Sequence, residues 1–71
     1  MHILLVPKRA IPSLSDPRAT DGDLVSDVLR VVQSFVAELN LEQHGYRLIV
    51  NGGAYQDIPQ LHFHLVSGRN A

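Results

Sequence analysis

The sequence predicts an α+β fold, in which an antiparallel sheet of about three strands carries one long helix on one face. Three observations lead to this prediction. Residues 2–6 are apolar after His2 and end at a proline, residues 21–40 repeat apolar side chains at helical spacing, and residues 46–51 and 61–66 alternate in polarity. The 71 residues are enough for one small domain, which we assign to residues 1–71.

The first predicted strand, residues 2–6, is a short apolar run that stops at Pro7, which lacks the N–H that a strand donates. The run starts immediately after Met1, so we expect a shortened domain that lacks an N-terminal portion. Residues 8–20 are expected to form a connection, because their prolines, serines and aspartate favour turns.

The predicted helix spans residues 21–40. Thr20 is the expected N-cap, because its hydroxyl can accept a hydrogen bond from an N–H of the first turn, and Asn40 is the expected end. Aspartates near the start suit the positive end of the helix dipole. The apolar stripe is broad enough to cover a sheet and leave area for a partner chain. It contains Leu24, Val25, Val28, Leu29, Val31, Val32, Phe35, Val36 and Leu39.

The last predicted strand, residues 61–66, carries the side chains best suited to catalysis or ligand binding. A period of two places Gln60, His62 and His64 on one face of it. The apolar residues on the other face are expected to point toward the helix. They are Leu61, Phe63 and Leu65.

Two histidines on one strand face allow three interpretations, and their spacing alone leaves all three open. The imidazoles of His62 and His64 can ligate a common zinc ion. They can also attack and protonate an anionic ester, or they can be half-exposed histidines without chemistry. Asn51, the two glycines after it and Gln56 could surround a phosphate, although Asn-Gly-Gly is also an ordinary turn.

Composition and charge exclude several classes of function. The formal net charge is −1 and no basic run is present, which argues against binding a nucleic-acid polymer. The longest apolar stretch, residues 3–6, is too short to span a membrane, so we expect a soluble, cytoplasmic protein. Cysteine is absent, which excludes disulfides and leaves oligomerisation as the expected aid to so small a core.

Three segments together resemble the histidine-triad (HIT) nucleotide-binding family. Residues 2–13 resemble that family's His-x-Leu-Val-Ile-Pro-Lys strand and the turn after it, and residues 46–53 resemble its Tyr-Arg-hydrophobic-Asn-x-Gly segment. Residues 58–69 resemble its signature of alternating histidines with a Gly-Arg ending. The order of the segments and the intervening helix also agree, so the resemblance implies a HIT-like fold over nearly the whole chain.

The resemblance also implies an activity. His62 corresponds to the family's nucleophile, which attacks the α-phosphate of a nucleotide and forms a nucleotidyl-histidine that water then hydrolyses. His64 corresponds to the second catalytic residue, which contacts the phosphate or the leaving group. The expected phosphate- or nucleotide-binding residues are His2, Asn51, Gln56 and Gln60. The implied substrates are nucleoside phosphoramidates or dinucleoside polyphosphates, the implied assembly is a homodimer, and no cofactor or metal is expected.

The sequence departs from the family's pattern at three places. Gln60 replaces the first histidine of the triad, and Asp57 stands where a serine or threonine usually donates to the phosphate. The resemblance begins at the strand of residues 2–6, so the family's N-terminal portion, which builds the base and ribose pocket, is expected to be missing. Two alternatives to the enzyme therefore stay open: a catalytically degenerate HIT-like binding domain, and a histidine-based metal-binding module.

Overall fold

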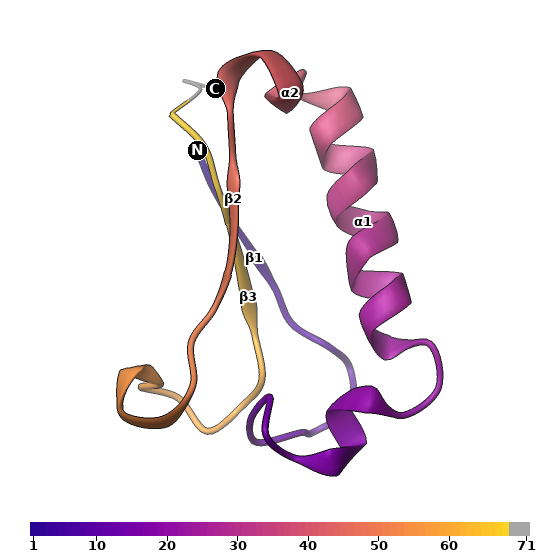
Figure 1. Cartoon of the computed structure of the whole chain (residues 1–71), viewed down its shortest axis with the longest axis vertical. Helices are drawn as coiled ribbons and strands as arrows, with labels where there is room; N and C mark the ends of the chain where they lie inside the picture. The colour runs from indigo at the N-terminus through magenta and orange to yellow at the C-terminus, as the bar shows by residue number, and fades with distance from the viewer. Residues whose placement is uncertain (69–71) are drawn as a thin grey trace.

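A three-stranded antiparallel sheet packs against one long helix in the computed structural model, which describes residues 1–68 (Figure 1). The strands are β1 (His2–Leu5), β2 (Arg47–Val50) and β3 (Phe63–Val66), and the helix is α1 (Leu24–Glu38). Three short helical segments lie in the connections. They are η1 (Pro17–Thr20), α2 (Leu41–His44) and η2 (Gly53–Tyr55). The predicted α+β class, with about three strands and one covering helix, is confirmed.

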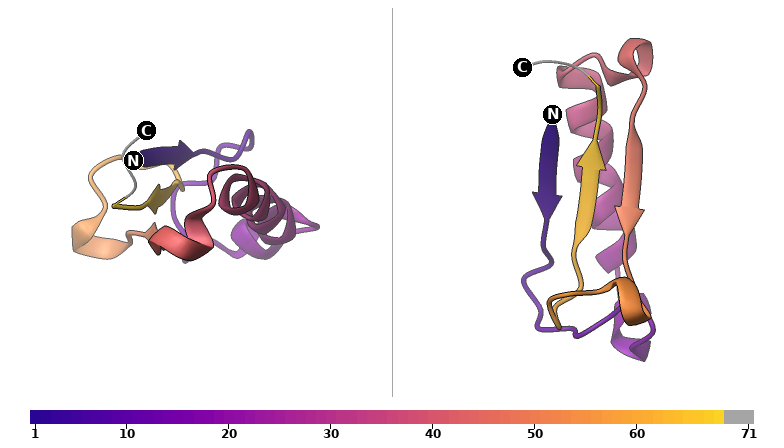
Figure 2. Two further views of the ribbon diagram at one scale, coloured as in Figure 1. Left: turned by 90° about the horizontal axis from the view of Figure 1, so that it is seen from above. Right: turned by 90° about the vertical axis from the view of Figure 1, so that its left-hand side faces the viewer.

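The central strand of the sheet is β3, the last in sequence, and the strand order is β1-β3-β2 (Figure 2, right). Both neighbours run antiparallel to it. The register pairs His64 with Leu4 on one side and with Ile49 on the other. This central position matters for function, because the alternating histidines are flanked by side chains from two other strands.

The core lies between the sheet and α1. Leu61, Phe63 and Leu65 are all buried, which confirms the predicted inward face of the last strand. Leu65 packs with Val32 of α1 and with Leu41 of α2, whereas Leu61 and Phe63 pack in a second group. The residues that join Leu61 and Phe63 in that group come from the long connection after β1 and are Ile11 and Ala19.

The other face of the sheet, which we call the open face, lies on the side away from α1 (Figure 2, right). Its side chains follow from the register and from the alternation of burial along each strand. Several apolar side chains remain exposed there, for example Leu4, which is 56% exposed. The open face carries His2 and Leu4 of β1, His64 and Val66 of β3, and Arg47 and Ile49 of β2.

The start of the helix differs from the prediction. The helix begins at Leu24 with Asp23 in the N-cap position, and Thr20 is not its cap. Thr20 belongs to η1, where its hydroxyl donates to the carbonyl of Pro17 at 2.9 Å. Gly22 has φ +52°, a left-handed conformation that interrupts the chain between η1 and α1. Residues 21–23, which the pattern assigned to the helix, therefore form the turn between η1 and α1.

The end of the helix lies where the sequence predicted it. Asn40 adopts the left-handed conformation (φ 56°, ψ 42°), which stops α1 and starts α2. Asparagine tolerates this conformation better than most residues. The turn brings Leu41 into the core, where it is fully buried.

The strands are shorter than the alternating patterns suggested, since β1 ends at Leu5, β2 spans Arg47–Val50 and β3 begins at Phe63. Burial nevertheless alternates through Leu61 and His62 before β3 begins, so the two faces continue beyond the strand. Among residues 1–68, no helix is both long and apolar enough to cross a membrane.

Candidate active site

His62 lies immediately before β3, and a backbone contact fixes its ring. Its Nδ1 is 2.6 Å from the main-chain carbonyl oxygen of Gln60. A carbonyl oxygen can only accept a hydrogen bond, so Nδ1 of His62 is the nitrogen that carries the proton. In the neutral ring, Nε2 then holds the free lone pair. The contact therefore selects the tautomer that makes Nε2 the nucleophilic atom.

His64 contacts a histidine from the neighbouring strand. Nε2 of His2 is 2.7 Å from Nδ1 of His64, and the ring centroids are 4.9 Å apart. One proton must lie between the two nitrogens, because two unprotonated nitrogens could not form a hydrogen bond. The pair can accept one further proton on an outer nitrogen and keep its hydrogen bond. This arrangement leaves Nε2 of His64 as the atom that can donate to, or accept from, a ligand.

The rings of His62 and His64 are neighbours in an edge-to-face arrangement, with centroids 5.0 Å apart and an interplanar angle of 76°. His2, His64 and His62 therefore form a continuous row across β1 and β3. Among residues 1–68, no three His, Cys, Asp or Glu side chains are grouped so that they could hold a metal ion. The ring nitrogens of the row can take part in nucleophilic and acid–base chemistry.

Asn51 lies directly after β2 and is half-buried. The last register pair of β2 and β3 is Val50 with Phe63. One step further along an antiparallel pair places Asn51 across from His62 on the open face. The continued register therefore puts Asn51 on the same face of the sheet as His62.

The two glutamines predicted for the site both hold the chain in place in this structure. The side-chain amide of Gln56 donates to the carbonyls of Pro12, at 2.6 Å, and Ile58, at 2.9 Å. The amide of Gln60 donates to the carbonyls of Arg9 and Leu61, both at 3.2 Å. These contacts tie the segment before β3 to the connection after β1, and thus fix the backbone from which His62 projects.

The structure adds two groups that the sequence analysis did not assign to the site. One is the main-chain carbonyl of Gln60, which only the folded backbone can reveal. The other is Arg47, which is exposed on the open face and lies directly across from Val66. The alternation of residues 46–51 was a signal for Arg47, because it places residues 47, 49 and 51 on one face. Asp57 is exposed in the loop before β3.

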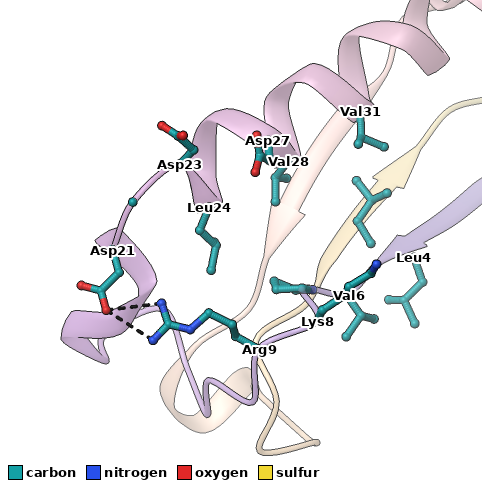
Figure 3. Close-up of a pocket in the computed structure, with 13 residues that line it drawn as sticks. Leu4, Val6, Lys8, Arg9, Asp21, Asp23, Leu24, Asp27, Val28 and Val31 are labelled. Atoms are coloured by element: carbon teal, nitrogen blue, oxygen red, sulfur yellow. Dashed lines mark hydrogen bonds and ion pairs between the residues drawn. The ribbon is translucent and has the colours of Figure 1, made fainter.

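One cavity of the described residues lies away from the histidine row. It has a volume of about 650 Å³ and lies between the end of β1 and the start of α1 (Figure 3). Leu24 and Val28 project into it from the helix, and an ion pair between Arg9 and Asp21, at 3.4 Å, crosses one end. None of the three histidines lines this cavity.

The fold and the histidine row together define the class of protein. The family model of the HIT domain matches residues 1–71, so the chain belongs to the HIT family. Among solved structures, a HIT family hydrolase from Legionella pneumophila superposes with a TM-score of 0.86 at 29% sequence identity, over 99% of this chain and 64% of that chain. A histidine triad protein from Clostridium difficile gives a TM-score of 0.84 at 35% identity, over 99% and 63%.

Two relatives in sequence show the range of the similarity. A HIT-like protein from Chlamydia pneumoniae is 35% identical over 71 residues, which cover 97% of this chain and 64% of the relative. The purine nucleoside phosphoramidase of Escherichia coli K12 is 30% identical over 70 residues, which cover 96% of this chain and 59% of that enzyme. The chain therefore spans less than two thirds of the length of these relatives.

Proposed function

We propose that this chain carries the reactive centre of a nucleotidyl hydrolase or transferase that acts at the α-phosphate of a nucleotide. The substrates are nucleoside phosphoramidates or dinucleoside polyphosphates. The observation that carries the proposal is the 2.6 Å contact from Nδ1 of His62 to the carbonyl of Gln60, because it leaves Nε2 as a free nucleophile. The similarity to a purine nucleoside phosphoramidase supports the same class of substrate.

In the first step, Nε2 of His62 forms a bond to phosphorus as the bond from phosphorus to the leaving nitrogen or oxygen breaks. The proton stays on Nδ1 and is donated in a hydrogen bond to the carbonyl of Gln60, so the positive charge on the nucleotidyl-imidazole is stabilised by a main-chain dipole. The leaving atom takes a proton from Nε2 of His64. His2 supports this transfer, because it shares a hydrogen bond with Nδ1 of the same ring.

In the second step, water attacks phosphorus and the bond from phosphorus to Nε2 of His62 breaks. The water proton passes to Nε2 of His64, and a nucleoside monophosphate leaves while His62 becomes neutral again. Asn51 donates its side-chain amide to a phosphate oxygen throughout. Gln56 and Gln60 contribute by holding the backbone around His62, and Gln60 supplies its carbonyl rather than its side chain.

The test is turnover of adenosine 5′-phosphoramidate by the wild type and by His62→Ala. We expect the variant to lose at least about a thousandfold in kcat/KM, as is usual when a nucleophile is removed. Ile49→Ala is the control, because Ile49 lies beside His64 on the open face and has no polar group. It should stay within about threefold of the wild type, which is under 1 kcal/mol. Equal turnover by wild type and His62→Ala contradicts the proposal.

If wild type and His62→Ala are both inactive while folded, the degenerate binding domain becomes the better account, and binding of a nucleoside monophosphate is then measured.

The functional assembly in this proposal is a homodimer. β2 is an edge strand of the sheet, and α1 exposes Val25 and Leu29 although both are large apolar residues. Unpaired strand edges and exposed apolar stripes are surfaces that a second copy can cover. Sedimentation at micromolar concentration should give a dimer for the wild type and a monomer for Leu29→Asp. A wild-type monomer at these concentrations contradicts the dimer.

A further inference from the structure

The open face extends past the histidine row to a cationic end. Arg47 lies across from Val66, one step of the sheet beyond His64. Side chains at such diagonal positions have Cβ atoms about 7–8 Å apart, and a guanidinium reaches several ångströms further. Among residues 1–68, the ion pairs involve Arg9, Arg18 and Arg30, and none involves Arg47. The guanidinium of Arg47 is therefore available to a ligand on this face.

A cavity of about 510 Å³ lies at the same end. Arg47, Val66 and Ser67 are among the residues that line it, so it borders the open face beside the outer end of β3. The carboxylate closest in sequence is that of Glu42, whose Oε1 accepts a hydrogen bond from the Tyr46 hydroxyl at 3.5 Å. Within residues 1–68, the guanidinium of Arg47 thus borders this cavity without an ion-pair partner.

The direction of the proposed reaction points toward this end. The attacking and leaving atoms lie on opposite sides of phosphorus, and the leaving atom must be within reach of the acid, Nε2 of His64. Along the extended chain that leads into β3 and through it, the order is His62, His64, Val66, with about 7 Å between successive positions on one face. A leaving group protonated by His64 therefore extends toward Val66 and Arg47, while the nucleoside is joined through one of the three oxygens that surround this axis.

The structure assigns to Arg47 the role of a leaving-group subsite, which binds a second anionic group on the substrate, a carboxylate or a phosphate. This inference rests on the proposed function and narrows its substrate class. A planar guanidinium forms paired hydrogen bonds with either anion, so both are accepted. The favoured substrates are nucleoside phosphoramidates of amino acids, with a free carboxylate, and dinucleoside polyphosphates, with further phosphates beyond the scissile bond.

A matched pair of substrates tests the carboxylate. Adenosine 5′-phosphoramidates are made from β-alanine, which carries a carboxylate, and from β-alanine amide, which does not. We expect Arg47→Gln to lower kcat/KM for the first by about fivefold, the size expected for a solvent-exposed ion pair, and to leave the second unchanged. Arg47→Lys, which keeps the charge but loses the paired hydrogen bonds, should lie between. A dinucleoside polyphosphate tests the phosphate in the same way. If Arg47→Gln lowers kcat/KM only for the carboxylate substrate or only for the polyphosphate, the affected substrate carries the anion that Arg47 binds.

Arg30→Gln is the control variant, because Arg30 is an exposed arginine of α1 that pairs with Asp27 and lies on the other side of the sheet. It should affect none of the substrates. An equal loss on the charged and neutral phosphoramidates in Arg47→Gln, or no loss on any substrate, overturns the subsite.

A binding measurement separates failure of the subsite from failure of the proposed function. Inorganic pyrophosphate is added to the protein while the Nε–H resonance of Arg47 is followed by NMR. If pyrophosphate shifts that resonance but the protein has no turnover, Arg47 binds an anion and the proposed chemistry is refuted. If the protein turns over substrate, the resonance does not shift and Arg47→Gln loses no kcat/KM selectively on the anionic substrates, the proposed chemistry stands and the anion site at Arg47 is refuted.

Discussion

Replacing Gln60 by alanine should leave the proposed nucleophile intact, although other HIT proteins carry a histidine at the corresponding position of the signature. The group that fixes the tautomer of His62 is the main-chain carbonyl of residue 60, 2.6 Å from Nδ1, and any side chain leaves it in place. The alanine variant loses only two hydrogen bonds of 3.2 Å, to the carbonyls of Arg9 and Leu61. At about 0.5–1.5 kcal/mol each, they contribute about 1–3 kcal/mol to the free energy of unfolding.

The unchanged main-chain carbonyl also limits the effect on activity. Gln60→Ala should reduce kcat/KM for adenosine 5′-phosphoramidate by less than about tenfold, or 1.4 kcal/mol, and Gln60→His should stay within the same range. Long-range ¹H–¹⁵N NMR reports which nitrogen of His62 is protonated, and Nδ1 should carry the proton in all three proteins. A folded Gln60→Ala variant without turnover, or with the His62 proton on Nε2, refutes the reasoning.

Three further predictions concern the fold. Leu65→Ala should lower the free energy of unfolding by about 3 kcal/mol in urea titrations, because Leu65 is 0% exposed, whereas Leu4→Ala, at a 56% exposed site, should cost less than about 1 kcal/mol. Asn40→Gly should change the free energy of unfolding by less than about 0.5 kcal/mol, but Asn40→Ala should lower it by about 1 kcal/mol. The reason is that residue 40 has a φ of 56°, which alanine adopts less readily than glycine or asparagine. Hydrogen bonds from Arg18 lower the pKa of Asp16 from 3.8 to about 2. The stabilisation that these bonds give the folded state is therefore present above pH 4 and is lost as the pH falls to 2. Asp16→Asn should lower Tm at pH 7 and should have the same Tm as the wild type below pH 2.

The sequence predicted the main elements of the fold because their patterns are local. The apolar repeat located α1, and the inward face of Leu61, Phe63 and Leu65 followed from a period of two. The helix start could not be located, because the Pro17 to Thr20 turn and the positive φ of Gly22 depend on how the connection docks Ala19 into the core. At this position, tertiary packing of the connection overrides the local sequence signal that predicted Thr20 as the N-cap.

The candidate site was predictable only in part. The spacing of His62 and His64 places both on one strand face, whereas their link to His2 depends on a contact between residues 62 positions apart in sequence. That contact requires β1 to lie beside β3, as it does in the strand order β1-β3-β2. The family resemblance placed His2 at the site, whereas the residue pattern alone did not. The carbonyl of Gln60 was not predictable at all, since every residue carries the same group and only the backbone path selects one.

Transfer of the nucleotidyl group to Nε2 of His62 is tested most directly by trapping the nucleotidyl-histidine intermediate. Wild type and His62→Ala are mixed with adenosine 5′-phosphoramidate, quenched in base, in which phosphohistidine bonds survive, and mapped by peptide mass spectrometry. We predict an adenylyl group on the wild-type peptide that contains His62, localised to that residue by fragmentation, and none in the variant. Turnover without an adduct, or an adduct on His64 that persists in His62→Ala, would contradict the account.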